Sequence, residues 1–184
     1  NGNLETVTDP NGNVTRTVCD RNDRRVRTEY ADGSAETVAY DPVGRVAART
    51  DAAGNTTRFE YDAVGNLIKV IDALGGETTA AYDERDGLVA VTDALGRTTR
   101  YERDPEGRLL ATVLPLGQRE TATYDAEGNR VGLTTFDGKS LALAYDAADR
   151  LASRVVSGLL AESFLFSPAG RLLESSDASG TTRR

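Results

Sequence analysis

A period of 21 residues, kept without gap or insertion, is the feature that most limits what this chain can fold into. One row of residues marks the frame; its members are Cys19, Tyr40, Tyr61, Tyr82, Arg103, Tyr124, Tyr145 and Phe166. Asp follows every member of this anchor row except Phe166, and Gly stands 14 residues after every anchor except at Leu159. Such a period indicates a repeat array, in which each unit buries its apolar side only against its neighbours.

The frame divides residues 1–184 into a single array of about eight units. They start at residues 19, 40, 61, 82, 103, 124, 145 and 166, and a partial unit occupies residues 1–18. Gly2-Asn3-Leu4 aligns with Gly65-Asn66-Leu67. Because the frame is cut inside a unit at both ends, we expect the chain to be a piece of a longer array.

The pattern Asp-x-x-Gly occurs twice in a typical unit, about ten residues apart, and each occurrence is a turn signal, because Asp caps its own backbone and Gly accepts a positive φ. About six residues remain between turns, which suits a strand. Each unit is therefore predicted to be a two-stranded antiparallel hairpin. The residues predicted to be its structural anchors are Tyr40, Asp41, Gly44, Gly54, Tyr61, Asp62, Gly65, Gly75, Tyr82, Asp83, Gly96, Gly107, Gly117, Tyr124, Asp125, Gly128, Gly138, Tyr145, Asp146 and Gly170.

The odd length of the unit restricts how the strands connect. Side chains alternate between faces along a strand, so two even loops would invert the faces in every repeat. One loop must then be odd, and a three-residue loop ending in a left-handed Gly is the common solution. Placed at the second turn (52–54), it predicts four apolar pairs: Ala47 with Phe59, Ile68 with Ala80, Val89 with Tyr101, and Val131 with Leu143.

This register puts the anchor tyrosines on one apolar face. The opposite face receives Arg58, Glu60, Arg100 and Glu102, interrupted by the aliphatic residues Leu67, Leu88, Leu109 and Leu151. We interpret the Tyr row as packed core rather than a platform for stacking sugar rings, because Tyr packs well across strands. Native twist should coil the array into a curved strip.

Composition argues against several function classes. Acidic side chains outnumber basic ones 29 to 22, which disfavours a nucleic-acid partner, and no apolar run is long enough to span a membrane. With no His and one Cys, neither a Ser-His nor a Cys-His pair can form. The Asp rows are interpreted as turn caps rather than a calcium ladder. We therefore predict no enzyme activity, no catalytic residue, no cofactor and no metal.

The motif Tyr-Asp-x-x-Gly-(Arg/Asn)-Leu, followed by Asp-x-x-Gly-x-x-Thr, as in 40–46 and 93–99, closely resembles the Rhs/YD-repeat family over the whole chain. Four residues depart from it and weaken their units: Arg25, Arg103, Arg130 and Leu159. No match occurs to the DPxGxxxG-type motif linked to toxin self-cleavage; Asp9-Pro10-Asn11-Gly12 is an ordinary repeat turn.

The resemblance implies an all-β strip that spirals into a segment of a hollow shell. In bacterial members such a shell encloses a C-terminal toxin, and in the animal teneurins it forms an extracellular adhesion barrel. We therefore expect a non-catalytic shell segment, secreted or delivered to the cell exterior by a bacterium. Its partners would be the rest of the shell, the enclosed toxin and secretion-system components. An adhesion or carbohydrate-binding module is the alternative.

Overall fold

The chain is all-β in the computed structural model, which describes residues 4–157, 159–177 and 180–183. No helix occurs among these residues. Contacts cluster into two compact units, one of Asn1–Asp86 with Val91–Arg97, the other of Gly87–Ala90 with Thr98–Arg184. The predicted partial repeat at Gly2-Asn3 and the residue before Leu159 lie outside the described residues. The single-array boundaries inferred from the sequence frame stay a prediction.

Strands of five or six residues make up most of each unit. In the first unit they are β1 (Leu4–Thr8), β2 (Val14–Cys19), β3 (Arg25–Glu29), β4 (Ala35–Tyr40), β5 (Val46–Thr50), β6 (Thr56–Tyr61), β7 (Leu67–Ile71) and β8 (Glu77–Tyr82). Strand β9 (Leu88–Thr92) has residues in both units. In the second unit they are β10 (Thr98–Arg103), β11 (Leu109–Val113), β12 (Arg119–Tyr124), β13 (Arg130–Thr134), β14 (Ser140–Tyr145), β15 (Leu151–Val156), β16 (Leu159–Phe166), β17 (Leu172–Asp177) and β18 (Gly180–Arg183).

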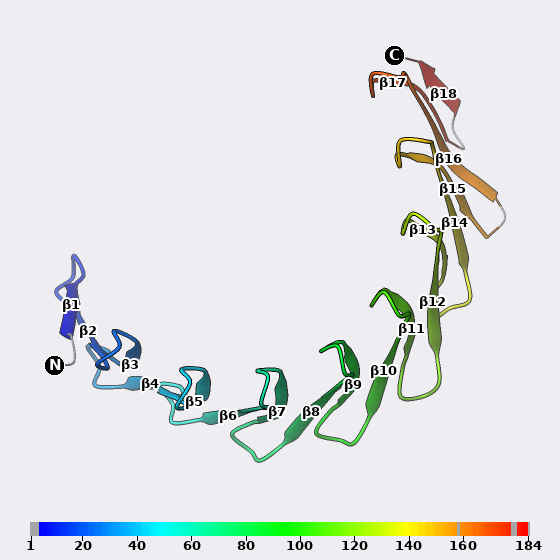
Figure 1. Cartoon of the computed structure of the whole chain (residues 1–184). Helices are drawn as coiled ribbons and strands as arrows, with labels where there is room; N and C mark the ends of the chain where they lie inside the picture. The colour runs from blue at the N-terminus through cyan, green and yellow to red at the C-terminus, as the bar shows by residue number, and fades with distance from the viewer. Residues whose placement is uncertain (1–3, 158, 178–179, 184) are drawn as a thin grey trace. The chain divides into compact units, whose positions relative to one another are not determined.

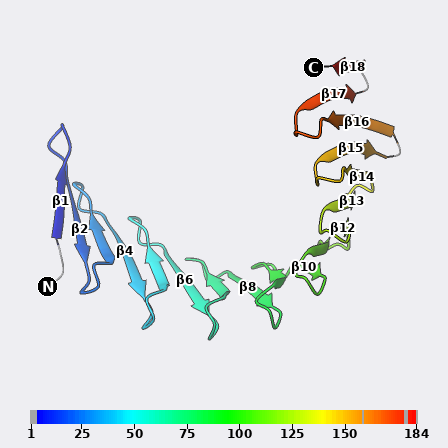
Figure 2. The same cartoon turned by 45° about the horizontal axis from the view of Figure 1, so that its top comes forward.

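Within each unit, every strand contacts only the strand before it and the strand after it, and all pairings are antiparallel (Figure 1). Figure 2 shows β1 and β2 running in opposite directions as the first hairpin of the series. No second layer packs on either unit within the described residues. The predicted fold class, an all-β array of hairpins, is confirmed.

Both turns of a typical repeat are three-residue loops. At the second turn the Asp51 amide donates to the Asn55 carbonyl (2.9 Å), the Gly54 amide donates to the Asp51 carbonyl (3.0 Å), and Gly54 has a φ of 87°. The β5–β6 ladder ends at the pair Ala48–Arg58, one residue before the predicted pair of Ala47 with Phe59, and its register is the one that this pair requires. The β7–β8 and β13–β14 ladders likewise end one residue before Ile68 with Ala80 and Val131 with Leu143, in the register that these pairs require. The pair Val89–Tyr101 stays a prediction.

The first turn differs from the expectation that only one loop of each repeat has an odd number of residues. It has the same loop geometry as the second, so it is not an even loop: the Asp41 amide donates to the Arg45 carbonyl and Gly44 has a φ of 94°. A β-bulge restores the faces. The register runs from Glu60–Lys69 to Tyr61–Leu67, which leaves Ile68 as an extra residue. The same shift occurs beside Tyr40, Arg103, Tyr124, Tyr145 and Phe166.

The bulge also corrects the assignment of faces. Directly paired residues share a face, so Leu67, Leu109 and Leu151 lie on the anchor side, opposite Tyr61, Arg103 and Tyr145, and their prediction on the other face was wrong. The charged residues lie on the face predicted for them, because Arg58 and Glu60 alternate with Phe59 and Tyr61 along β6, and Arg100 and Glu102 hold the same places in β10; all four are exposed. A bulge re-aims side chains, and here it gathers aliphatic groups beside the anchors.

Burial is shallow throughout. Only Ala111 and Thr28 are buried among the described residues, and the anchor tyrosines are half-buried rather than enclosed in a core. A one-layer sheet cannot remove its side chains from water more completely, because nothing packs on its faces. Stability therefore depends on contacts between neighbouring strands.

The unit that starts at Tyr145 lacks the second-turn Asp and uses another connection. There Arg154 pairs with Glu162, as the repeat register requires, and the register then shifts so that Val155 pairs with Leu160. Side chains before the shift thus stay on the faces that the repeat register gives them, because the register shift lies within the β15–β16 pair, after Arg154.

The left-handed second-turn glycine gives a direct stability prediction. Gly54→Ala should lower the free energy of unfolding by roughly 1 kcal/mol, since an added Cβ meets no atom within 4 Å and the penalty is one of backbone strain alone. Gly54→Asn should lose less, because Asn tolerates this conformation. Thermal unfolding followed by far-UV circular dichroism measures both, and equal stability of wild type and the Ala variant would contradict the assigned turn.

Candidate functional site

The most regular chemistry of the chain lies where one hairpin meets the next. We define a junction as the anchor of one repeat together with the fifth and sixth residues after the preceding anchor, for example Tyr61 with Arg45 and Val46. At each junction with a Tyr anchor from Tyr40 on, the hydroxyl donates to the carbonyl of that sixth residue at 2.9–3.1 Å. The pairs are Tyr40–Arg25, Tyr61–Val46, Tyr82–Leu67, Tyr124–Leu109 and Tyr145–Arg130.

The bulge explains why this carbonyl needs a side-chain donor. The β5–β6 ladder ends at the pair Ala48–Arg58, so the Val46 carbonyl lies beyond it. A backbone carbonyl that loses its ladder partner without another donor is destabilising when partly buried. The Tyr61 hydroxyl, 15 residues later in sequence, supplies that donor at 3.0 Å.

An arginine joins the same site. Arg45 donates from Nε to Asp41 Oδ2 (2.7 Å) and from Nη1 to the carbonyl of Asp62 (3.1 Å), so it connects the turns of two successive repeats. Its guanidinium carbon lies 4.6 Å from the centre of the Tyr61 ring, a cation–π geometry. The arrangement recurs for Arg24 over Tyr40, Arg108 over Tyr124 and Arg150 over Phe166, at 4.4–4.9 Å.

The turn aspartate fixes this arginine. Asp41 Oδ1 accepts from the amides of Val43 (3.0 Å) and Arg45 (2.8 Å), while Oδ2 binds the Arg45 side chain. Burial alone would raise the pKa of Asp41, but the hydrogen bonds from Arg45 hold it below its ordinary value. Each of the predicted anchor aspartates accepts an amide of its own turn: Asp41, Asp62, Asp83, Asp125 and Asp146.

The predicted anchor glycines all have a positive φ between 77° and 114°. They are Gly44, Gly54, Gly65, Gly75, Gly96, Gly107, Gly117, Gly128, Gly138 and Gly170. The structure therefore brings the first-turn glycines, the aspartates and the tyrosines together at junctions, and it leaves the second-turn glycines at the opposite ends of the hairpins.

Arg103 stands where the sequence pattern expects an aromatic anchor, and the structure shows that it replaces the missing hydroxyl. Its Nε lies 3.3 Å from the Leu88 carbonyl, the acceptor that a Tyr would use, and its Nη1 donates to the Gly107 carbonyl (2.9 Å). The fifth residue of the preceding unit is Gly87 here. The guanidinium of this junction therefore comes from the anchor instead of from the preceding repeat.

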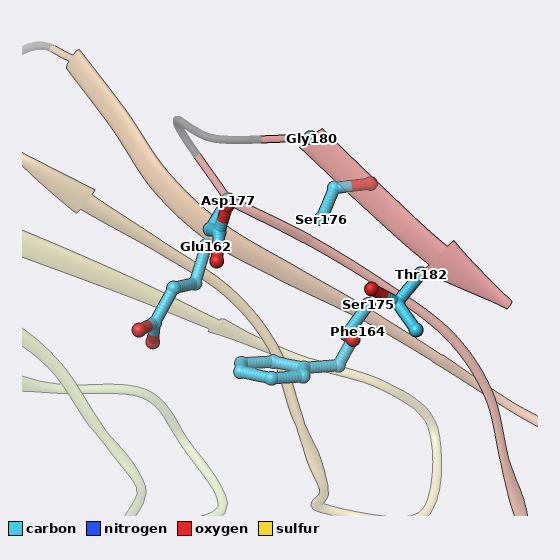
Figure 3. A pocket seen from close by; sticks show the side chains of 7 residues that line it. All are labelled: Glu162, Phe164, Ser175, Ser176, Asp177, Gly180 and Thr182. Atoms are coloured by element: carbon cyan, nitrogen blue, oxygen red, sulfur yellow. The ribbon is translucent and has the colours of Figure 1, made fainter. Parts of the chain in front are cut away.

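Other candidate sites have little support. Among the described residues no group of three or more His, Cys, Asp or Glu side chains could hold a metal ion, and no helix could span a membrane. A shallow hollow on β16–β18 is lined by Glu162, Phe164, Ser175, Ser176, Asp177, Gly180 and Thr182. In Figure 3 its polar groups point in different directions and do not converge on a ligand position.

Removing or adding one anchor hydroxyl tests the junction. Tyr61→Phe should lower the free energy of unfolding by about 1 kcal/mol, because the Val46 carbonyl loses its donor. Phe166→Tyr is the converse change and should raise stability by a similar or smaller amount by supplying a donor to the carbonyl of Leu151. Urea unfolding of both variants measures the effects, and two shifts in the same direction would contradict the assignment.

The turn aspartates predict loss of stability in acid. Hydrogen bonds from Lys139 and Thr135 lower the pKa of Asp137 from 3.8 to about 2, and a bond from Asn55 lowers that of Asp51. Since these folded-state pKa values lie below the unfolded ones, the stabilisation is present above about pH 4 and is lost as the pH falls towards 2. Melting temperatures measured from pH 7 to pH 2 should fall mainly in that window, and Asp137→Asn should make the fall shallower.

Comparisons with known proteins agree with this geometry. The model of a family described as RHS Repeat matches residues 1–35, 40–79, 82–119 and 103–140, together more than half of the chain. A search of curated proteins gave no significant match.

Solved structures with a similar fold include the Tc holotoxin pore of Photorhabdus luminescens, at 16% identity and a TM-score of 0.67, over 93% of this chain and 12% of that one. The TcdB2–TccC3 complex is similar at 17% identity and a TM-score of 0.56, over 99% of this chain and 14% of that one. The TcdB2–TccC3–Cdc42 complex gives 16%, a TM-score of 0.51, and the same coverage. This chain thus spans about an eighth of the length of these relatives. With its hairpins, its junctions and the family match over most of its length, the chain belongs to the RHS repeat family.

Proposed function

We propose that the chain is a non-catalytic wall segment of an Rhs-repeat shell that encloses a C-terminal toxin and helps to deliver it. The observation that carries this proposal is the junction, which connects one hairpin to the next while no second layer packs on the described part of the chain. Such a sheet grows by adding equivalent units, as a wall requires.

The uneven faces of the sheet support an enclosing role. The anchor side carries half-buried Phe59, Tyr61 and Val70, while Arg58 and Glu60 are exposed on the other side. A sheet whose apolar side has no covering layer favours a structure in which that side faces an enclosed volume, because closure shields it from bulk water.

Fold similarity supports, by analogy, the cargo and the route in this proposal. The similar structures include a Tc holotoxin pore and complexes of TcdB2 with TccC3, which favours, by analogy, a toxin as cargo. Partners would be the remaining shell, the toxin and secretion-system components, with delivery to the cell exterior. The toxin chemistry would lie outside these residues, whose turn aspartates serve the backbone.

The alternative of an adhesion or carbohydrate-binding module has less support from the tyrosines. Stacking on a sugar needs an accessible ring face. At the junctions of Tyr40, Tyr61 and Tyr124 a guanidinium lies over the ring and the hydroxyl is engaged by a carbonyl. These contacts favour a structural use of the row.

Electron microscopy of the natural full-length protein that contains this chain tests the proposal. We expect a closed wall with density inside it, and a variant that lacks the region after the repeats should keep the wall and lose that density. In limited proteolysis the same region should resist digestion until the wall is opened by Tyr40→Ala with Tyr61→Ala. An open or empty wall in the full-length protein would contradict the proposal and direct the work to glycan binding.

A further inference from the structure

Two positions in neighbouring repeats, 20 residues apart in sequence, lie beside each other at six junctions. They are the fifth residue after one anchor, which follows the turn, and the fourth residue after the next anchor, which is the left-handed residue of the next turn. We refer to them as the reading position and the read position. Asn66 and Asp86 are one such pair, and Arg45 and Gly65 are another.

Arg at the reading position occupies the space beside the read residue. A Cβ built on Gly44 would lie 3.1 Å from Nη1 of Arg24, which is tighter than ordinary contact. The corresponding distances are 3.8 Å for Gly65 and Arg45, 3.7 Å for Gly128 and Arg108, and 3.5 Å for Gly170 and Arg150. At Gly44 an added Cβ would crowd the guanidinium that lies over the anchor ring. The other three distances are ordinary van der Waals contacts, so at those sites the guanidinium would limit only side chains longer than Ala.

Asn is shorter than Arg, and where Asn stands at the reading position the read residue is Asp, whose carboxylate lies within hydrogen-bond distance of the Asn amide. Nδ2 of Asn66 donates to its own turn at Asp62 Oδ2 (3.0 Å) and also to Asp86 Oδ1 (2.8 Å) of the next turn. In the second unit Asn129 does the same with Asp149 (2.9 Å). Both read aspartates have a positive φ, 62° at Asp86 and 56° at Asp149, a conformation that Asp tolerates better than most residues.

The two pairings do not mix along the chain. Reading arginines precede Gly at the four places given above, and reading asparagines precede Asp at both described places. In the sequence, Asn3 likewise precedes Asp23 by 20 residues, and Asp23 has a φ of 58°. The remaining junction pairs Gly87 with Gly107, and there Arg103 supplies the guanidinium itself.

The second turns provide an internal comparison, since residues of the same types stand 20 apart there without touching. Asn13 and Asn55 precede Gly33 and Gly75, a combination absent from the first turns. An added Cβ at Gly33 or Gly75 would meet no atom within 4 Å. The rule that Asn precedes Asp and Arg precedes Gly therefore holds at the first turns, where the two positions are in contact. It does not hold at the second turns, where they are not.

We propose that the reading and read positions form a pairing code that decides which hairpin can follow which. A hairpin edge with Arg accepts a following hairpin with Gly, and an edge with Asn accepts one with Asp. The partner of each edge is thus a hairpin of stated chemistry. A mismatched Arg–Asp junction draws the guanidinium off the anchor ring. A mismatched Asn–Gly junction leaves the Asn amide only the acceptor in its own turn and removes the hydrogen bond to the next hairpin.

A double-mutant cycle in the full chain tests the code at Asn66 and Asp86. The melting temperatures of N66R, D86G and the double variant are measured by circular dichroism. The change in melting temperature caused by D86G should be more negative in the wild-type background than in the N66R background. The difference between the two changes should be about 2–4 °C for each kcal/mol of coupling. Hydrogen–deuterium exchange of the segment 82–92 should rise in N66R and fall back in the double variant.

The reverse exchange, R45N with G65D, gives a second cycle that must show coupling of the same sign. The matched control is N55R with G75D at the second turns, where the effects should add to within roughly 1 °C. Additive effects in both junction cycles, or equal coupling in the control cycle, would overturn the proposal.

Discussion

The odd number of residues in the repeat is the constraint on which the other features depend. Each unit must take one residue out of the regular pleat, and it does so at the bulge beside the anchor, where Ile68 is extra between the pairs made by Tyr61 and Glu60. The ladder stops short of the bulge, so a carbonyl needs a donor, and the anchor hydroxyl of the next hairpin supplies it. The bulge and the Tyr row thus follow from one requirement, which is that side chains return to the same face after a repeat of 21 residues.

Sequence reasoning was sufficient for the hairpins and for the second turn, because Asp-x-x-Gly and strand alternation are local signals that no second layer overrides. It missed the bulge, although the signal was available: both turns carry the same motif, so both loops should have been expected to have three residues. It also placed Leu67 on the wrong face, since a bulge changes side-chain direction without any change in composition. The contact of Arg45 with Asp62 lies between repeats and only coordinates reveal it.

Two unusual residues of the array each go together with a changed residue in the preceding repeat. Asp86 replaces a turn glycine where the preceding repeat has Asn66, and Arg103 replaces an aromatic anchor where the preceding repeat has Gly87. In each case the hydrogen bonds across the junction are kept while their chemistry changes. Conformity with the family pattern therefore has to be judged over pairs of repeats, because the unit of structure is the junction and not the hairpin alone.

Because each strand of a unit contacts only the strands before and after it, the sheet should respond to force in a particular way. Within either unit, tension applied between the two ends acts on successive strand pairs in series, because inter-strand hydrogen bonds lie across the strands. The hairpins would then open one after another, each releasing about 60 Å of chain, the extended length of 21 residues less two strand spacings. Such a sheet would unfold one hairpin at a time under tension, and the contacts of one junction would set the force needed for each step.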